Sequence, residues 1–179
     1  LGVGILGPIA TIGGIVHLVN QGLMKITLFF CAGNFAETLG VHHISHMNGI
    51  GRRMPLTMAA FTLGSLGMIG VPPMAGFISK WYLGTGGLTA GKPWVIAILV
   101  ASSLLNAAYF LPIIYRAWFR EPAGSWSARP SIGALETHWM LLFPPLITAL
   151  LALLAGLLAD APFSPLEWAR LITAREYRP

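Results

Sequence analysis

The chain has 179 residues, of which 55% are hydrophobic and only 9% are charged, and its mean hydropathy is +0.72. A soluble domain usually carries about 25% charged residues, so this composition excludes an ordinary soluble protein, a disordered segment and a collagen-like chain. The net charge of +5 does not indicate nucleic-acid binding, because the arginines lie between apolar blocks, as in the loops that orient membrane proteins. We therefore expect an all-α, multi-pass integral protein of the cell (inner or plasma) membrane, in contact with the lipid bilayer.

The chain begins within hydrophobic sequence, at Leu1-Gly2-Val3, without an initiator Met or a basic leader. We interpret it as a piece of a longer protein. The single cysteine, Cys31, lies inside an apolar run. A disulfide within the chain and a thiolate metal site are therefore excluded.

About four transmembrane helices are predicted, because four apolar segments can each cross a hydrocarbon layer of about 30 Å at 1.5 Å per residue. They cover residues 9–32, 54–83, 94–119 and 138–159. The first is expected to end at a cap formed by Gly33 and Asn34. Residues 163–178 mix leucine, arginine and aromatic residues, which predicts a short interfacial helix after the last span.

The second span is expected to be discontinuous. It is too long for one simple helix and contains the run Gly70-Val-Pro-Pro-Met-Ala-Gly76. Pro72 and Pro73 remove two backbone donors and Gly76 permits a turn, which predicts two half-helices over 55–69 and 76–83. Gly84, Gly86 and Gly87 are expected to form a linker after the second half. A break at membrane depth usually marks a functional site.

A stripe of polar side chains lies in the first span. An ammonium near the centre of a span costs about 2.5 to 3.5 kcal/mol on insertion scales, so Lys25 requires compensation. His17, Gln21 and Lys25 are spaced four apart and would form one stripe about 12 Å long on a helix. Groups at this spacing suit a proton relay. The alternative is that Lys25 reaches the interface with its long stem and His17 only packs.

Lys80 is the second cation in a span, a few residues after the break. Carbonyls freed by the two prolines could coordinate its ammonium. The alternative is an interfacial anchor beside Trp81 and Tyr82. The acidic residues all lie outside the predicted spans, so a counter-charge for either lysine would come from another part of the protein or another subunit. They are Glu37, Glu121, Glu136, Asp160, Glu167 and Glu176.

Two further patterns bear on chemistry and orientation. His42, His43 and His46 resemble a metal-binding tract but have only Glu37 nearby as a further ligand, so we expect a solvated loop and no metal site. A Gly-rich phosphate loop, a Ser-His-Asp set and paired carboxylates are missing, so neither a catalytic centre nor a cofactor is expected. Charged loops place one face in the cytoplasm, with Arg52, Arg53, Arg116, Arg120 and Arg129; Lys92, Arg170, Arg175 and Arg178 lie on the other.

Three segments resemble a known family. The run from His17 to Gly33, the loop over 48–55 and the break from Gly70 to Lys80 are similar to the antiporter-like membrane subunits, which include the D-type component of Mrp cation/proton antiporters and the L, M and N proton-pumping subunits of respiratory complex I. The similarity covers about residues 2–119. It implies that 1–119 form the C-terminal part of a fold of about fourteen helices with two inverted repeats, and that 120–179 form a loop, a closing helix and an interfacial tail.

The resemblance also implies roles for individual residues. Lys25 matches a relay lysine, His17 a relay histidine, and Lys80 the ionisable residue of a broken helix on the exit side. Gln21 departs from the pattern, because many members have a titratable His there, and this favours a water-bridged route past position 21.

Three functions follow from these observations and stay open at this point. The first is a proton-translocating subunit of a Mrp D-like, multisubunit cation/proton antiporter, with other membrane subunits, protons and Na⁺ as partners. The second is a pumping subunit of complex I (NADH:quinone oxidoreductase) or of a related membrane-bound hydrogenase, in which case the chain is part of an enzyme without holding its catalytic centre. The third is a structural membrane subunit that conducts nothing.

Overall fold

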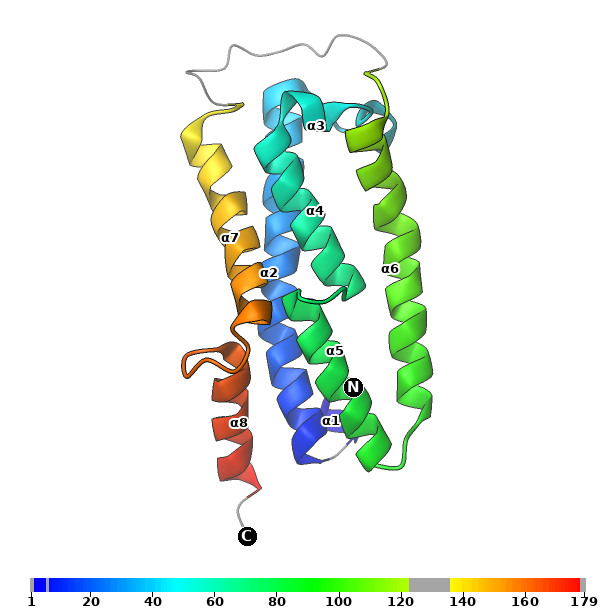
Figure 1. The fold of residues 1–179 in the computed structure, drawn as a ribbon, viewed down its shortest axis with the longest axis vertical. Coiled ribbons are helices and arrows are strands. Elements are labelled where there is room, and N and C mark those ends of the chain that lie inside the picture. The colour runs from blue at the N-terminus through cyan, green and yellow to red at the C-terminus, as the bar shows by residue number, and fades with distance from the viewer. Residues whose placement is uncertain (1, 6, 123–135, 178–179) are drawn as a thin grey trace.

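The structure, a computed structural model, describes residues 2–5, 7–122 and 136–177, and its regular elements there are all helical (Figure 1). The predicted all-α class is confirmed. In chain order the helices are α1 (Gly2–Ile5), α2 (Pro8–Leu39), α3 (Ile50–Arg53), α4 (Pro55–Ile69), α5 (Ala75–Thr89), α6 (Trp94–Phe119), α7 (Trp139–Leu157) and α8 (Pro165–Glu176), with one 3₁₀ turn, Ile44–His46.

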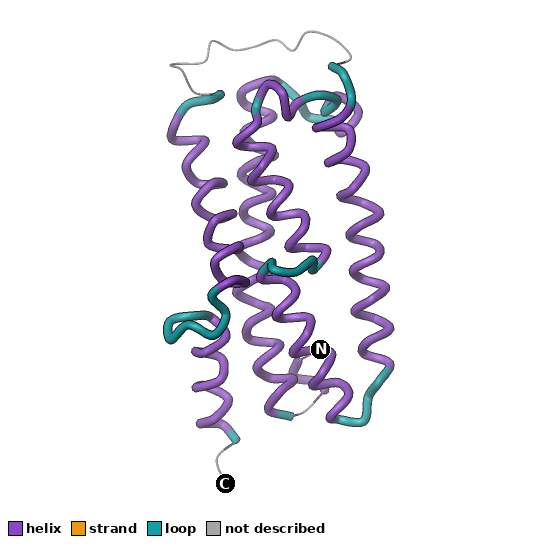
Figure 2. The backbone as a smooth tube through the Cα atoms, in the orientation of Figure 1, coloured by secondary structure: helices purple, strands orange, loops and turns teal. Residues whose placement is uncertain are grey.

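The spans follow the predicted pattern. Three helices, α2, α6 and α7, are each long and apolar enough to cross a membrane. The fourth crossing is made by α4 and α5, which have 15 residues each and follow one another beside α2. Figure 2 shows the loop between them halfway along the bundle, next to the uninterrupted α2. The discontinuous second span is therefore confirmed, and α4 has the predicted bounds.

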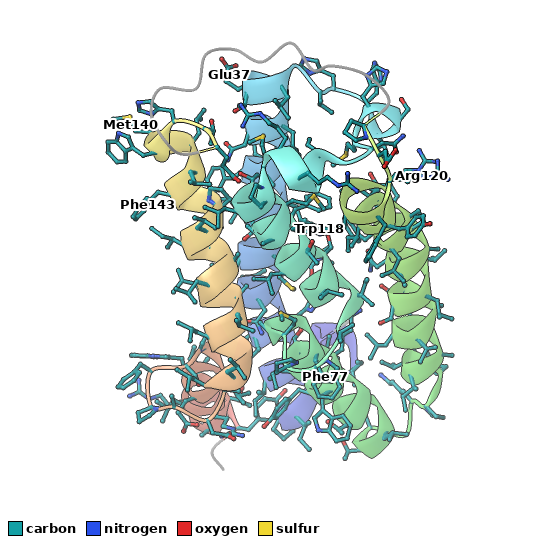
Figure 3. All side chains as sticks on the ribbon, turned by 45° about the horizontal axis from the view of Figure 1, so that its top comes forward. Glu37, Phe77, Trp118, Arg120, Met140 and Phe143 are labelled. Carbon is teal, nitrogen blue, oxygen red and sulfur yellow. The ribbon has the colours of Figure 1, made fainter. Side chains whose placement is uncertain are left out.

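The predicted end of the first span was wrong. Helix α2 continues through Gly33 and Asn34 to Leu39 and ends at Gly40, which has φ 66°. The side chain of Asn34 does not cap α2, because its Nδ2 donates a hydrogen bond of 2.8 Å to the Leu141 carbonyl of α7. Glu37 therefore belongs to the last turns of α2 instead of lying outside the helix, and Figure 3 shows it at one end of the bundle.

The predicted linker of glycines was also wrong, because Gly84, Gly86 and Gly87 lie inside α5. Gly86 and Gly87 permit close packing, whereas Gly84 has only ordinary van der Waals contact around it. A Cβ on Gly86 would lie 2.6 Å from the Ala10 nitrogen, and one on Gly87 would lie 2.9 Å from the Val95 Cβ. Neighbouring helices can approach the backbone of α5 at these positions because no side chain intervenes.

Charged residues gather at the two ends of the bundle. Helix α3, which carries Arg52 and Arg53, lies at the same end of the bundle as the last turn of α6 (Figure 1). Arg120 follows this last turn of α6 and is labelled in Figure 3. Arg170 of α8 lies near the other end and donates a 2.6 Å hydrogen bond to the Tyr82 hydroxyl. That bond raises the pKa of Arg170 above its usual range. Arg129 and Arg178, which the sequence assigns to opposite faces of the membrane, lie outside the described residues.

Glu136 has a structural role that the sequence did not reveal. Its carboxylate is buried and accepts hydrogen bonds from the backbone N–H groups of Leu56 and Thr57, at 2.8 and 2.7 Å, and from the Thr57 hydroxyl at 2.5 Å. These amides belong to the first turn of α4, where N–H groups have no partner within the helix. Glu136 therefore caps α4 from a distance of about 80 positions along the chain.

We expect Glu136→Gln to destabilise the protein by about 1 to 3 kcal/mol, because the neutral amide replaces one charged acceptor oxygen by a donor next to a backbone N–H. The measurement is thermal stability of the purified protein. Glu121→Gln is the control, since Glu121 is exposed. Equal stability of the two variants would contradict the capping role.

Candidate functional site

The break between α4 and α5 leaves two backbone carbonyls available. In a continuous helix the carbonyls of Met68 and Ile69 would accept from residues 72 and 73, which are both proline and have no N–H. Gly70 and Val71 instead turn back, and their N–H groups both donate to the Leu66 carbonyl, at 2.9 and 3.1 Å. The C-terminal end of α4 thus presents free oxygens and the negative pole of a helix at the middle of the bundle.

Lys80 fills this position. Its Nζ donates hydrogen bonds to the carbonyls of Met68 at 3.2 Å and Ile69 at 2.9 Å, and to the Ser103 hydroxyl of α6 at 2.7 Å. Gly70 has φ 89°, and a Cβ on it would lie 2.9 Å from the Lys80 Cδ. A glycine is therefore needed both for the turn and for the approach of the lysine stem. We refer to the Met68 and Ile69 carbonyls with the Ser103 hydroxyl as the Lys80 cradle.

The first half of α5 is joined to α2 by polar contacts. His17 Nδ1 lies 2.9 Å from the Ser79 hydroxyl, which in turn donates to the Gly76 carbonyl at 3.1 Å. The Asn20 amide donates to the Ala75 carbonyl at 2.8 Å. Since Ser79 immediately precedes Lys80, these contacts place His17 beside the segment that carries Lys80.

Lys25 occupies a different environment, on an exposed face of α2. It lines a cavity of about 440 Å³ whose wall includes Met68, Tyr109 and the histidines His42 and His43. Among the described residues Lys25 has no ion pair or hydrogen bond. Met68 lies next to both lysines, because it lines the Lys25 cavity and its carbonyl binds Lys80.

Gln21 lies between His17 and Lys25 on α2 and is half-buried. Its side chain makes no hydrogen bond within the part of the chain that the structure describes. The structure therefore joins His17 to Ser79, the residue before Lys80, while Lys80 itself binds α4 and α6. No hydrogen bond among the described residues links His17, Gln21, Lys25 and Lys80 to one another.

A second cavity of about 420 Å³ lies between α5 and α6. Lys80 and Ser103 lie in its wall, together with Thr85 and apolar residues that include Phe77 and Leu99. Residues of the cradle thus border both spaces, since Met68 also lines the Lys25 cavity and Ser103 lines this one.

The residues predicted to break the second span lie partly in the loop between α4 and α5 and partly in α5. Pro72 and Pro73 lie in the loop, and Gly76 lies one residue inside α5, whose first residue is Ala75. A Cβ on Gly76 would overlap the Gly67 carbonyl oxygen. The two half-helices can therefore contact one another only while position 76 has no side chain.

Sequence reasoning placed Asn20 beside the polar stripe of His17, Gln21 and Lys25 but missed Ser79 and Ser103. Ser79 could have been found, since it is the residue before Lys80. The sequence signal for Ser103 is weaker, because it consists only of two neighbouring serines within an apolar span. Only the fold shows which of the two binds Lys80.

Metal binding has no structural support in the described residues, where no group of three His, Cys, Asp or Glu side chains is placed to hold an ion. The rings of His43 and His46 pack edge to face at 5.8 Å. His42 and His43 are exposed and also border the Lys25 cavity, so the loop is not merely a solvated connection.

Comparisons with known proteins agree on one family. The family model described as NADH:quinone oxidoreductase/Mrp antiporter, TM, matches residues 1–106. NADH-quinone oxidoreductase subunit N of Desulforudis audaxviator is 44% identical over 120 residues, which cover 67% of this chain and 24% of that protein. The D-type component of the Na⁺/H⁺ antiporter of Bacillus subtilis is 30% identical over 156 residues, which cover 87% of this chain and 31% of that protein.

The fold has a solved counterpart. A chain in the structure of the Mrp complex from Dietzia sp. DQ12-45-1b matches with a TM-score of 0.84 and 24% identity, over 100% of this chain and 40% of that chain. The chain therefore spans between about a quarter and two fifths of the length of these proteins.

Proposed function

Because the chain belongs to the NADH:quinone oxidoreductase/Mrp antiporter transmembrane family, we propose that it is part of a proton-translocating membrane subunit in which His17, Lys25 and Lys80 carry the proton. The observation that supports this most directly is the Lys80 cradle, an ammonium held at a mid-membrane helix break by two backbone carbonyls and a serine. An ionisable residue inside a span is costly, and its usual justification is an ion or proton pathway.

The cradle suits a group that gains and loses a proton. Its three acceptors are uncharged, so Lys80 is stabilised by hydrogen bonds and by the C-terminal pole of α4 and not by a fixed carboxylate. A carboxylate at this position would hold the ammonium form firmly. Without one, a charge brought close by a neighbouring helix or subunit changes the protonation of Lys80, and this couples proton movement to the rest of the complex.

The route along α2 requires water. His17 and Lys25 are eight residues apart, about 12 Å along the helix, and the side chain between them on the same face is Gln21. An amide does not titrate at physiological pH, but it can both donate to and accept from a water molecule. We therefore propose that Gln21 orients bridging water between the Lys25 cavity and the His17–Ser79 pair.

Two host assemblies are compatible with the chain. A cation/proton antiporter of the Mrp type is supported by the match to the Bacillus subtilis antiporter component, which extends over 87% of the chain. A complex I-type assembly, or a related hydrogenase, is supported by the 44% identity to subunit N. In either assembly we propose that other membrane subunits are the partners and that the location is the plasma membrane; Na⁺ is a transported ion only in the first.

The host is tested with inverted membrane vesicles that contain the full-length parent complex. The pH change inside the vesicles is followed after adding Na⁺, or after adding NADH. A Na⁺-driven change identifies the antiporter and an NADH-driven change the redox pump. An assembled complex that produces a pH change with neither Na⁺, NADH nor the electron donor of a related hydrogenase would contradict the proposed function and support a structural subunit.

Lys25→Ala tests the role of the first lysine. We expect proton transport to fall by at least about tenfold, because the variant removes the titratable group that faces the cavity. The amount of assembled complex should not change, since Lys25 is exposed and makes no described polar contact. Phe29→Ala is the control, as Phe29 lines the same cavity without titrating. Normal transport by Lys25→Ala would contradict the relay on α2.

A further inference from the structure

Helix α6 contacts the rest of the bundle in an unusual way. Its buried residues lie near its two ends, with Val95 at the start and Phe110, Ile113 and Ala117 in the second half. Between Val95 and Phe110, α6 has no buried residue, and the cavity between α5 and α6 lies along this stretch. The polar contact in this stretch that reaches another helix is the 2.7 Å hydrogen bond from Lys80 to Ser103.

Ser103 differs chemically from the other two members of the cradle. An ammonium has three N–H groups and no lone pair, and the three acceptors use all of them. Once Lys80 loses a proton, its amine has two N–H groups and one lone pair. A carbonyl can only accept, whereas a hydroxyl can rotate and donate to that lone pair. Ser103 is therefore the cradle member that can bind both protonation states of Lys80.

The position of Ser103 indicates where a proton from Lys80 would go. The Met68 and Ile69 carbonyls belong to the α4 backbone, and Ser103 lies in the wall of the α5–α6 cavity together with Lys80. The wall of this space of about 420 Å³ is mostly apolar, so water molecules would bind only where Lys80, Ser103 and Thr85 offer polar partners. The Thr85 hydroxyl on the same wall donates to the Trp81 carbonyl at 2.9 Å, so its oxygen is left to accept a hydrogen bond from water.

We propose that Ser103 is the hydroxyl through which Lys80 exchanges its proton with water in the cavity between α5 and α6. In the releasing step an N–H bond of Lys80 breaks and an O–H bond forms on Ser103, while the original Ser103 O–H breaks and its proton passes to a cavity water. Uptake is the reverse, so serine ends each step as a neutral hydroxyl. This proposal rests on the proposed proton translocation and adds the group by which the proton reaches or leaves Lys80.

The test compares variants of Ser103 and its neighbour in the full-length parent complex, in the vesicle assay described above. Ser103→Ala should lower proton transport by at least about tenfold per assembled complex. Ser103→Thr keeps the hydroxyl and should retain most of the transport. Ser102→Ala is the matched control, because Ser102 precedes Ser103 on α6 but is not in the cavity wall.

The outcomes separate this proposal from the function on which it rests. Transport by Ser103→Ala equal to that of Ser102→Ala, with transport by Lys80→Ala lost, would overturn the role of Ser103 alone. Unchanged transport by Lys80→Ala would instead overturn the proposed function. Equal losses in Ser103→Thr and Ser103→Ala would also overturn the hydroxyl role, because they would show that the serine matters only for its shape.

A second measurement applies if Ser103→Ala does not assemble. Ser103→Cys in the parent complex should react with a water-soluble maleimide at least about tenfold faster than Ser102→Cys. In a hydrated cavity the maleimide can reach the cysteine, and water allows its thiol to ionise to the reactive thiolate. Cys31 is fully buried and should not compete. An unreactive cysteine at position 103 would overturn the proposal, since it would show that no water reaches Ser103.

Discussion

Replacing Lys80 with Ala should abolish proton transport by the parent complex, with a loss of at least about a hundredfold, while the complex still assembles. The variant removes the titratable group and leaves the carbonyls of Met68 and Ile69 to hydrogen-bond water. The measurement is the pH change in inverted vesicles, normalised to the amount of assembled complex.

Lys92 provides a matched control for this variant. Its Nζ also donates to two backbone carbonyls, those of Gly4 at 3.0 Å and Ile5 at 3.3 Å. It differs in position, because it lies in the connection between α5 and α6 at the end of the bundle and not at the mid-membrane break. Lys92→Ala should therefore transport normally. Equal transport by the two variants would make Lys80 an anchor and contradict its role as a proton carrier.

The fold could be predicted from sequence wherever local chemistry decides the outcome. The double proline after Ile69 ends α4 at the predicted residue, because positions 72 and 73 cannot donate to the carbonyls four residues before them. The limits of α6 match the predicted span because Pro93 and Arg120 flank a predominantly apolar run. The family resemblance, which rested on the motifs around Lys25 and Lys80, is confirmed.

The errors arise where tertiary contacts decide the outcome. Asn34 is a common helix terminator, but its amide is bound by α7, so α2 continues for another turn. Gly84, Gly86 and Gly87 resemble a linker in sequence, yet they lie inside α5, where Gly86 contacts Ala10 and Gly87 contacts Val95. Glu136 is predicted only to lie outside the spans, whereas the fold brings it to the first turn of α4.

In the candidate site, too, the features set by local sequence could be predicted and those set by tertiary contacts could not. The sequence locates Lys80 after the break and predicts free carbonyls nearby, since both follow from positions within one short segment. The third partner, Ser103, is 23 residues further along and on another helix. Its choice over Ser102 depends on the rotation of α6 about its axis, which the apolar pattern of a lipid-exposed helix does not specify.

Gly76→Ala should have the largest structural effect among single small substitutions at the break. The added Cβ would overlap the Gly67 carbonyl oxygen and lie 3.2 Å from the Met24 sulfur. Because the first of these atoms belongs to a helix backbone, relief requires the two half-helices to separate, at a cost of about 1 to 3 kcal/mol or more. Separation would also move the Met68 and Ile69 carbonyls relative to Lys80, so transport should fall together with stability.

Gly84→Ala in the same helix is the control. A Cβ at Gly84 would have only the Leu99 Cδ1 within 4 Å, at 3.7 Å, which is ordinary van der Waals contact. Alanine is favoured over glycine inside a helix by about 0.5 to 1 kcal/mol. Thermal unfolding of the purified parent complex should therefore occur at a lower temperature for Gly76→Ala and at an equal or higher temperature for Gly84→Ala. The reverse order would show that the half-helices do not depend on close backbone contact, and the geometry of the Lys80 cradle would then need another cause.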